Sequence, residues 1–386
     1  MLFGDNVTTM FTYLHGMKML GVLLSALIFM PFAHAQDMAS VVNTDVVTIH
    51  PEEDEVLEAS TQEKHFTNLR QLTFGGDNAE AYFSFDGKKL SFQSNNPAWG
   101  LKCDQIFWMD IEEAADNRIY QPMPVSNGQG RTTCSFYMPD GKRVLYASTF
   151  KGGINCPPAP ETNGRYLWSI DASYDIFIGD EKGKMVKQLT EIAGYDAEAV
   201  VSPKGDKILF TSTRDGDLDL YIMDINGKNV KRLTNTLGYD GGAFFSPDGS
   251  KIVFRASRPQ GKDTIEYKDL LTKGLVAPTN MEIYTMNVDG SNQRQITHLG
   301  KANWAPFFHP SGKKIIFSSN HHSDRGYDFQ LFMVNEDGTN LEQITFESKF
   351  NAFPMFSPDG KKLVFSSNRN NGGTRDTNVF IADWVE

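Results

Sequence analysis

The chain has 386 residues, of which 40 % are hydrophobic and 22 % are charged, and this balance excludes a disordered chain and a protein with many membrane spans. The formal net charge is -11 and no cluster of Lys and Arg stands out, so we expect no nucleic-acid partner. Length alone allows two or three domains. The 33 Gly, 17 Pro and 28 Phe favour many short strands joined by tight turns over long helices.

The N-terminal region is predicted to direct export. Residues 19–33 form an apolar run that follows Lys18 and precedes an Ala-x-Ala site ending at Ala35. This order is typical of a secretory signal peptide, so we predict one over residues 1–35, with cleavage after Ala35. The alternative is a transmembrane anchor, which Pro31 and the shortness of the run disfavour. We therefore expect an exported protein, periplasmic or extracellular, without a stable membrane span.

The next segment, residues 36–65, is acidic and lacks periodic apolar spacing. Segments of this composition cannot bury enough apolar surface to fold alone. We predict that residues 36–65 are a flexible acidic lead-in and that residues 66–386 form the folded domain.

A five-residue word recurs six times after residue 65. It consists of an apolar residue followed by a variant of Ser-Pro-Asp-Gly, and its copies end at Gly87, Gly141, Gly205, Gly249, Gly312 and Gly360. The intervals are 54, 64, 44, 63 and 48 residues, which indicates a repeat of about 44 residues with insertions. Because Pro presets φ and Gly accepts a positive φ, each copy is predicted to be a turn between two strands.

A second turn word follows in most repeats, as in Val288-Asp-Gly290. Each repeat is therefore predicted to contain four strands, A to D, with tight turns after A and after C. Six such repeats in tandem predict an all-β fold, a six-bladed β-propeller. The alternatives are an open array of hairpins and two β-sandwich domains.

The last repeat has no D strand before the chain ends. The sequence of residues 67–74 matches that of the D strand at residues 339–346 in six of eight positions. We therefore expect the N-terminal strand to complete the last blade and close the ring. Closure removes the unpaired sheet edge that an open ring would expose.

The repeats resemble those of a known family. Residues 195–234, YDAEAVVSPKGDKILFTSTRDGDLDLYIMDINGKNVKRLT, are similar to the WD-repeat-like propeller repeats of the TolB family, and the resemblance covers residues 66–386. It implies a propeller that serves as a scaffold or binding module, although similar propellers also accompany peptidases or act as sugar lyases. TolB carries an N-terminal α/β domain, whereas here the predicted lead-in before the ring is an acidic segment of 30 residues. A role in the Tol system is therefore left open.

One face of the predicted propeller collects charged side chains. The loops from strand D to A and from B to C emerge on the same face, where they surround the central channel. Residues at the start of strand A and the end of strand B are expected to form a concave, polar ligand site. The candidates are Glu80, Asp196, Glu198, Asp240, Arg214, Arg258, His321 and Arg369. The alternative is that these side chains pair with one another and fix neighbouring blades.

Two long insertions, residues 150–173 and 258–280, fall in B-to-C loops and are expected to overhang this same face. In the second, Asp263 is predicted to cap a short helix that ends at Gly274 and that acts as a lid or packs on the rim. The three cysteines, Cys103, Cys134 and Cys156, map to this face in the first two blades. An oxidising compartment allows one disulfide, between Cys156 and either Cys103 or Cys134.

The sequence gives weaker indications of a catalytic or metal-binding site. No Gly-x-Ser-x-Gly occurs, which disfavours a serine peptidase. Asp215 and Asp217 open like a calcium loop but lack the Gly and Glu of an EF-hand, so only a looser cation site is possible there. We hypothesise a monomeric binding module, without cofactor or catalysis, that recognises an envelope protein, peptide or glycan. The alternatives are a metal-assisted hydrolase or lyase using His321, Glu80 and Glu198, and an accessory propeller of a separately encoded peptidase.

Overall fold

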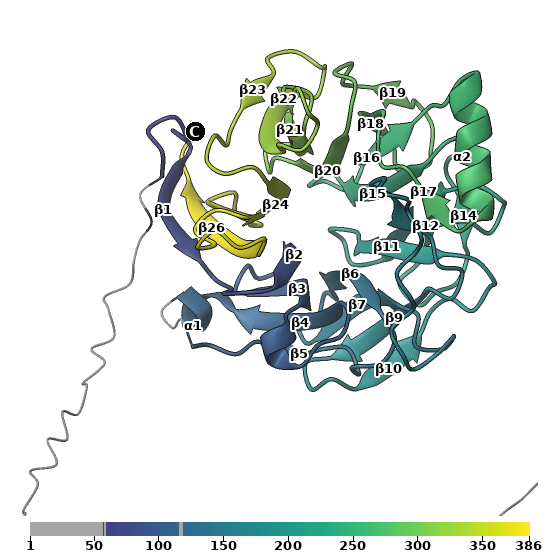
Figure 1. Cartoon of the computed structure of the whole chain (residues 1–386), viewed down its shortest axis with the longest axis horizontal. Helices are drawn as coiled ribbons and strands as arrows, with labels where there is room; N and C mark the ends of the chain where they lie inside the picture. Colours follow the sequence, from purple (N-terminus) through teal and green to yellow (C-terminus); the bar gives the residue numbers. More distant parts are fainter. Residues whose placement is uncertain (1–56, 58, 116–118) are drawn as a thin grey trace, which may run out of the picture. The chain divides into compact units, whose positions relative to one another are not determined.

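The computed structural model describes residues 57, 59–115 and 119–386. Six four-stranded antiparallel sheets are arranged as blades around a central axis, which Figure 1 views end-on. The predicted all-β six-bladed propeller is therefore confirmed. The predicted signal peptide and the lead-in up to residue 56 lie outside the described residues. Within the described part of the chain, no helix is long and apolar enough to cross a membrane.

The first three blades each run outward from the channel. Blade 1 contains β2 (Asp77–Phe83), β3 (Lys89–Asn95), β4 (Gln105–Asp110) and β5 (Met123–Pro124). Blade 2 contains β6 (Thr132–Tyr137), β7 (Arg143–Ser148), β9 (Asp175–Asp180) and β10 (Met185–Gln188). Blade 3 contains β11 (Asp196–Val201), β12 (Lys207–Ser212), β13 (Asp219–Asp224) and β14 (Lys231–Arg232). A 3-10 turn η1 (Pro97–Trp99) and a short helix α1 (Ile111–Ala115) decorate blade 1.

The last three blades follow the same order. Blade 4 contains β15 (Asp240–Phe245), β16 (Lys251–Ser257), β18 (Met281–Asn287) and β19 (Arg294–Gln295). Blade 5 contains β20 (Asn303–Phe308), β21 (Lys314–Ser319), β22 (Gln330–Asn335) and β23 (Glu342–Gln343). Blade 6 contains β24 (Asn351–Phe356), β25 (Lys362–Ser367), β26 (Asn378–Trp384) and β1 (Phe66–Gln71).

The recurring Ser-Pro-Asp-Gly word builds the turn between the two inner strands of a blade. In blade 4, the Ser246 hydroxyl donates to the Asp248 carboxylate at 2.6 Å, and the same carboxylate accepts the backbone N–H of Ser250. Gly249 takes a φ of 73° and its N–H donates to the Ser246 carbonyl at 2.8 Å. Each residue of the word therefore has a separate role in the turn, which explains why the word recurs.

The ring is closed by the N-terminal strand, as the sequence match indicates. β1 pairs antiparallel with β26, with Phe66 opposite Trp384. The chain just before β1 also packs on blade 6: the buried Glu63 carboxylate accepts hydrogen bonds from both terminal nitrogens of Arg369, at 3.0 and 2.9 Å. Leu57 forms an isolated bridge with Leu69. The end of the predicted lead-in is thus bound to the propeller.

A bulge interrupts every innermost strand. One residue in each bulge has a positive φ of 46° to 56°, and we call these six residues the channel ring. They are Glu80, Cys134, Glu198, Gly242, Ala305 and Phe353. The bulges appear as register shifts between the two inner strands of every blade. Because a bulge changes the direction of a side chain, this backbone feature decides what faces the channel.

An apolar layer lies two residues farther along each inner strand, and we call it the floor. Its members are Tyr82, Phe136, Val200, Phe244, Phe307 and Met355. Phe244 lies 5.3 Å from Tyr82 and 5.2 Å from Phe307 between ring centroids. An apolar cavity of about 330 Å³ adjoins the floor on the side of the Ser-Pro-Asp-Gly turns. The floor therefore separates that cavity from the polar channel ring.

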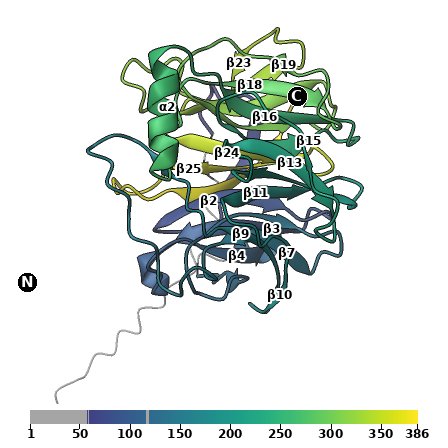
Figure 2. The ribbon, with the colours of Figure 1, turned by 90° about the vertical axis from the view of Figure 1, so that its right-hand side faces the viewer.

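The two insertions meet each other. β8 (Trp168–Ser169) in the first pairs with β17 (Leu275–Val276) in the second. The second also forms helix α2 (Lys262–Thr272), which lies at one face of the ring in Figure 2. The predicted capping by Asp263 is wrong, because the helix begins earlier, after Gly261, and Asp263 lies inside its first turn. Gly274 follows the helix with a φ of 66°.

Candidate functional site

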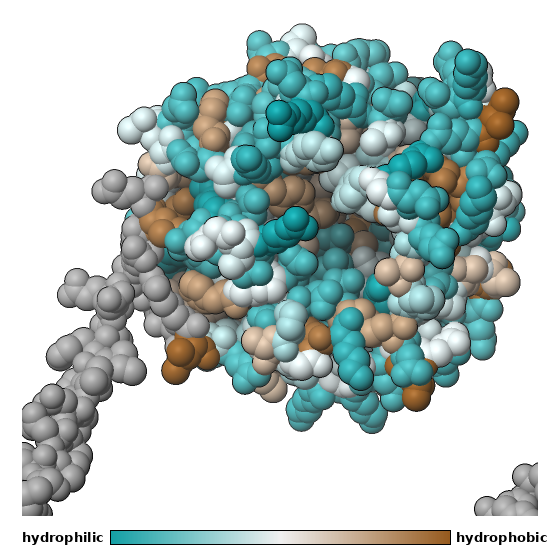
Figure 3. All heavy atoms as spheres, in the orientation of Figure 1, coloured by the Kyte–Doolittle hydropathy of each residue, from teal (hydrophilic) through white to brown (hydrophobic). Residues whose placement is uncertain are grey.

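A pocket occupies the loop-rich mouth of the channel. It encloses about 380 Å³ above the floor, and Figure 3 shows the hollow at the centre of the ring. Its residues come from the channel ring and neighbouring positions of the inner strands, from the second strands of blades 1 and 4, from the loops on the same face, and from the first insertion. One wall is polar and charged, while the other is aromatic. We call this cavity the central pocket.

The polar wall is built around Glu198 and Arg255. The Glu198 carboxylate accepts hydrogen bonds from the Thr211 hydroxyl at 2.7 Å, the Tyr239 hydroxyl at 2.7 Å and the Gly242 N–H at 2.8 Å. It also forms an ion pair with the buried Arg255 guanidinium, which donates to the Tyr239 hydroxyl as well. Burial opposes ionisation, but Arg255 and these donors lower the pKa of Glu198. The Glu198 carboxylate is therefore ionised, and groups of the protein bind both of its oxygens.

Two glycines make room for this network. A Cβ at Gly242 would lie 1.7 Å from Nη1 of Arg255, and a Cβ at Gly241 would lie 2.4 Å from Oε2 of Glu198. Gly241 is also the residue opposite Arg255 in the pairing of β15 with β16. Arg255 can thus enter the channel only because Gly242 carries no side chain, while Gly241 leaves room for the Glu198 carboxylate.

Glu80 is the other carboxyl of the channel ring, and its environment differs. Among the described residues it has no cation within ion-pair distance, and the Cys134 thiol and the Glu198 carboxylate lie near it. Burial, with a smaller contribution from the charge of Glu198, raises the pKa of Glu80 to about 7 against the lowering effects of Cys134 and Arg255. Burial likewise raises the pKa of Cys134, so its thiol stays protonated. Glu80 therefore titrates near neutral pH.

The aromatic wall combines the first insertion with blades 5 and 6. Trp168 lies 5.0 Å from Trp304 and packs on Arg255, whose Cζ is 5.1 Å from its ring centroid. Trp304 is held by a hydrogen bond from its indole N–H to the Pro278 carbonyl at 2.9 Å. Tyr166, 62 % exposed, stacks on Trp304 at the pocket mouth. The aromatic wall is thus rigid inside and exposed at the entrance.

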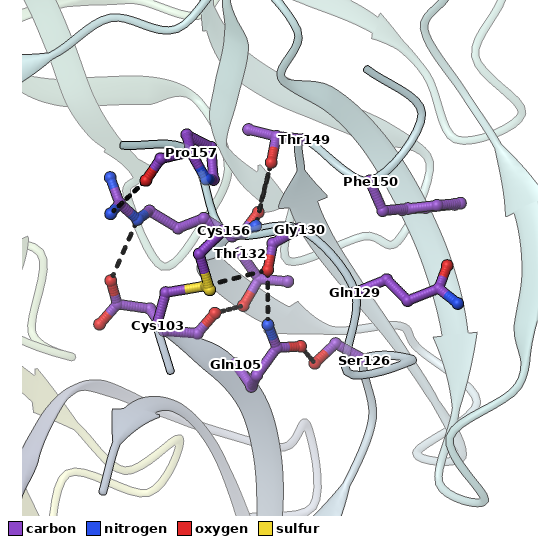
Figure 4. Close-up of a disulfide and its surroundings, with 12 residues drawn as sticks. Cys103, Gln105, Ser126, Gln129, Gly130, Thr132, Thr149, Phe150, Cys156 and Pro157 are labelled. Atoms are coloured by element: carbon purple, nitrogen blue, oxygen red, sulfur yellow. Dashed lines mark hydrogen bonds and ion pairs between the residues drawn. A yellow bond between two sulfur atoms is a disulfide. The ribbon is translucent and has the colours of Figure 1, made fainter. Parts of the chain in front are cut away.

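A disulfide anchors the first insertion to blade 1. Cys103 is bonded to Cys156, and Cys134 is the free cysteine among the described residues. Figure 4 shows the disulfide beside Gly130 and Gln105, where the Gln105 amide donates to the Gly130 carbonyl at 2.9 Å. Of the two pairings that the sequence allows, the structure therefore contains the one with Cys103. Cys134 is instead directed into the channel by its bulge.

Six of the eight predicted site residues lie outside the central pocket lining. The Arg214 Nη2 donates to both oxygens of Asp196 at 3.0 Å, and Arg258 donates to Asp240 at 2.5 Å. Each arginine also stacks on an aromatic ring of its own blade, such as Tyr221 for Arg214. The pairing named as the alternative is therefore present, but these pairs join the end of strand B to the start of strand A within one blade and not neighbouring blades.

In blades 5 and 6, the residues at the end of strand B have other partners than a carboxylate of strand A. The Arg369 Nη2 donates to the Asn351 side chain at 3.1 Å, besides the ion pair of Arg369 with Glu63. The His321 Nδ1 lies 2.9 Å from the Ser319 hydroxyl, and the His321 ring packs 4.5 Å from that of Phe332. Burial lowers the pKa of His321. Of the predicted set, Glu80 and Glu198 line the central pocket.

Cation-binding hypotheses find no arranged ligand set. In residues 57, 59–115 and 119–386, no group of three or more His, Cys, Asp and Glu is placed to hold a metal ion. The Asp217 carboxylate accepts hydrogen bonds from the Tyr267 hydroxyl and the Gly238 N–H, which fastens α2 to blade 3. Asp215 accepts one from the Tyr221 hydroxyl at 2.6 Å. Hydrogen bonds within the protein thus engage both carboxylates of the proposed loop.

Sequence reasoning missed Arg255 and Trp168. Arg255 follows Phe254 in a strand whose interior is otherwise apolar, and a charged residue inside a buried strand is a recognisable signal. The predicted set used the position four residues after the strand-B aromatic, whereas the position directly after it reaches the channel in blade 4. Trp168 carries no such signal, because the pairing of β8 with β17 places it.

Comparisons with known proteins agree with this architecture. A family model for the TolB beta propeller domain matches residues 150–275 and 268–383. The chain belongs to the TolB β-propeller domain family. A search of curated protein sequences finds no match to this TolB-like chain.

Two solved TolB structures show the same fold at low identity. A putative TolB from Agrobacterium tumefaciens has a TM-score of 0.51 and 21 % identity, with 81 % of this chain and 91 % of that chain covered. TolB from Acinetobacter baumannii has a TM-score of 0.52 and 19 % identity, with 77 % of this chain and 64 % of that chain covered. An oligogalacturonate lyase in complex with manganese has a TM-score of 0.46 and 12 % identity, with 82 % and 90 % covered. At these identities the likeness concerns the fold.

Proposed function

We propose that this TolB-like propeller is an exported binding module. In this proposal, its loop-rich face recognises an envelope protein, a peptide or a glycan by taking a part of it into the central pocket. The protein performs no chemistry itself. Export is supported by the signal-like residues 1–35 and by the disulfide between Cys103 and Cys156, which is typical of oxidising compartments.

The observation that carries the proposal is the form of the central pocket. It is closed below by the apolar floor, it encloses about 380 Å³, and it sets a hydrogen-bonding wall opposite an aromatic one. Pockets that combine apolar walls with a few placed polar groups are the usual ligand sites of proteins. The metal-assisted hydrolase or lyase lacks comparable support, since His321 packs on Phe332 outside the pocket lining.

The proposal is tested by binding arrays with two matched variants. Tyr166 and Tyr327 are both exposed tyrosines, 62 % and 77 %, but only Tyr166 lines the central pocket. Wild-type protein, Tyr166→Ala and Tyr327→Ala are screened against peptide and glycan arrays, and affinities of the hits are measured by calorimetry. We expect Tyr166→Ala to weaken binding at least ~10-fold, as loss of one aromatic contact does, while Tyr327→Ala binds like wild type. Equal behaviour of the two variants would place binding elsewhere.

A further inference from the structure

The charges that line the central pocket do not balance. Three carboxyl groups line it, those of Glu80, Asp104 and Glu198, against two guanidinium groups, those of Arg131 and Arg255. Arg255 is paired with Glu198, and the Arg131 Nε lies 3.8 Å from Asp104. Glu80 is left without a cation among the residues that the structure describes. The lining therefore lacks one positive charge.

The groups around Glu80 do not supply that charge. From β6 it faces the Cys134 thiol, from β11 the Glu198 carboxylate and from β16 the Arg255 guanidinium, while Asp104 acts from blade 1. The Nη2 of Arg255 is already shared between Glu198 and the Tyr239 hydroxyl. An ionised Glu80 is thus a partly buried charge without a counter-ion, and a cation brought by a ligand would stabilise it.

Aromatic side chains share the pocket lining with Glu80. They include the rings of Trp168, Trp304 and Phe353. Aromatic faces attract cations, and they also pack against methylene chains. An anionic ligand would instead meet the uncompensated Glu80. Arg255 is paired with Glu198 and Arg131 lies 3.8 Å from Asp104, while the Nε of each arginine makes no hydrogen bond among the described residues.

We propose that the central pocket takes a primary ammonium group at the end of an apolar stem, such as a lysine side chain of a peptide. The stem packs between the aromatic rings and the ammonium forms an ion pair with Glu80. This inference rests on the proposed binding function and names the ligand group that the pocket recognises. One added positive charge brings the five charged side chains and the ligand to neutrality.

The test compares probes that differ only in the amine. The full chain is titrated by calorimetry with acetyl-Ala-Ala-Lys-Ala-Ala-amide and with the same peptide acetylated at the lysine amine. At pH 8 we expect the free amine to bind at least ~10-fold tighter, which is the usual scale of a partly buried ion pair. Glu80→Gln should abolish this preference, while Glu347→Gln, an exposed carboxyl on the same face, should retain it.

The pH supplies a second measurement on the wild-type protein. With a pKa of Glu80 near 7, most of the carboxyl is ionised at pH 8 and little of it at pH 6. The lysine peptide should therefore bind about 10-fold more weakly at pH 6 than at pH 8. The acetylated peptide should show no such change. A free-amine affinity that is constant over this range contradicts the role of Glu80.

The remaining outcomes separate the two proposals. If the acetylated peptide binds as tightly as the free amine and Tyr166→Ala weakens both, the binding function stands and the ammonium inference is overturned. If neither peptide binds, the lysine assignment is overturned, and the arrays with Tyr166→Ala judge the binding function. A glucosamine trimer is titrated in parallel. If it binds in a Glu80-dependent way while the lysine peptide does not, the ammonium chemistry is supported and the lysine stem is overturned.

Discussion

Replacing Gly242 by Ala tests whether the charged network of the pocket depends on an absent side chain. The new Cβ would lie 1.7 Å from Nη1 of Arg255, at a residue with a φ of 54°. Arg255 has a flexible side chain, but its guanidinium is buried between Trp168 and Tyr239 and paired with Glu198. It cannot move aside without weakening that ion pair.

Gly100 provides a control, because it lies in the left-handed region with a φ of 75° and a ψ of 14° and has nothing within 4 Å of an added Cβ. Both variants place Ala in the left-handed region, which costs about 1–2 kcal/mol. Gly242→Ala should in addition lose the pairing of a buried charge, worth about 3–5 kcal/mol. The free energies of unfolding of both variants are measured by urea denaturation. A difference between them below about 1 kcal/mol would refute the reasoning.

Three further predictions address closure, the insertion and the titration of the pocket. Glu63→Gln should lower the free energy of unfolding, measured by urea denaturation, by about 3–5 kcal/mol, because it leaves Arg369 buried without its anion. The control Glu342→Gln removes the exposed ion pair with Lys64 and should lower it by less than about 1 kcal/mol. Cys156→Ser should cost about 4 kcal/mol, since the disulfide closes a loop with a sequence separation of 53, and wild type in reductant should match the variant. Folding raises the pKa of Glu80 from 4.5 to about 7, so ionisation of Glu80 disfavours the folded state. As the pH rises from 5 to 8, the free energy of unfolding of wild type should therefore fall by roughly 1–3 kcal/mol relative to that of Glu80→Gln. A difference between the two proteins that does not change with pH would contradict this prediction.

The arrangement of blades is visible in the sequence because it depends on local turn chemistry. The word ending at Gly249 specifies its own turn through Ser, Pro, Asp and Gly, and its six copies count the blades. Closure is visible for the same reason, since residues 67–74 repeat the pattern of a D strand. These features need no knowledge of contacts between distant residues, and they were predicted correctly.

The residues of the site were harder to predict from the sequence, because the bulges decide which side chains face the channel. Glu80 and Glu198 were found from their place at the start of strand A. Arg255 was missed because the space for its side chain depends on Gly242, which lies on the neighbouring strand. Trp168 is placed by the pairing of two insertions that are far apart in the chain. The pairing of Cys103 with Cys156 likewise depends on how blades 1 and 2 are joined.

The central claim is that the central pocket is where this propeller meets its ligand. It is tested most directly by placing a photoreactive phenylalanine analogue at Tyr166 or at Val186, an exposed residue of the outer strand β10, in the full chain expressed in cells. After irradiation, adducts are identified by mass spectrometry. We expect a discrete adduct from position 166 and none from position 186. Equal adducts from both positions, or an adduct from position 186 alone, would contradict the claim.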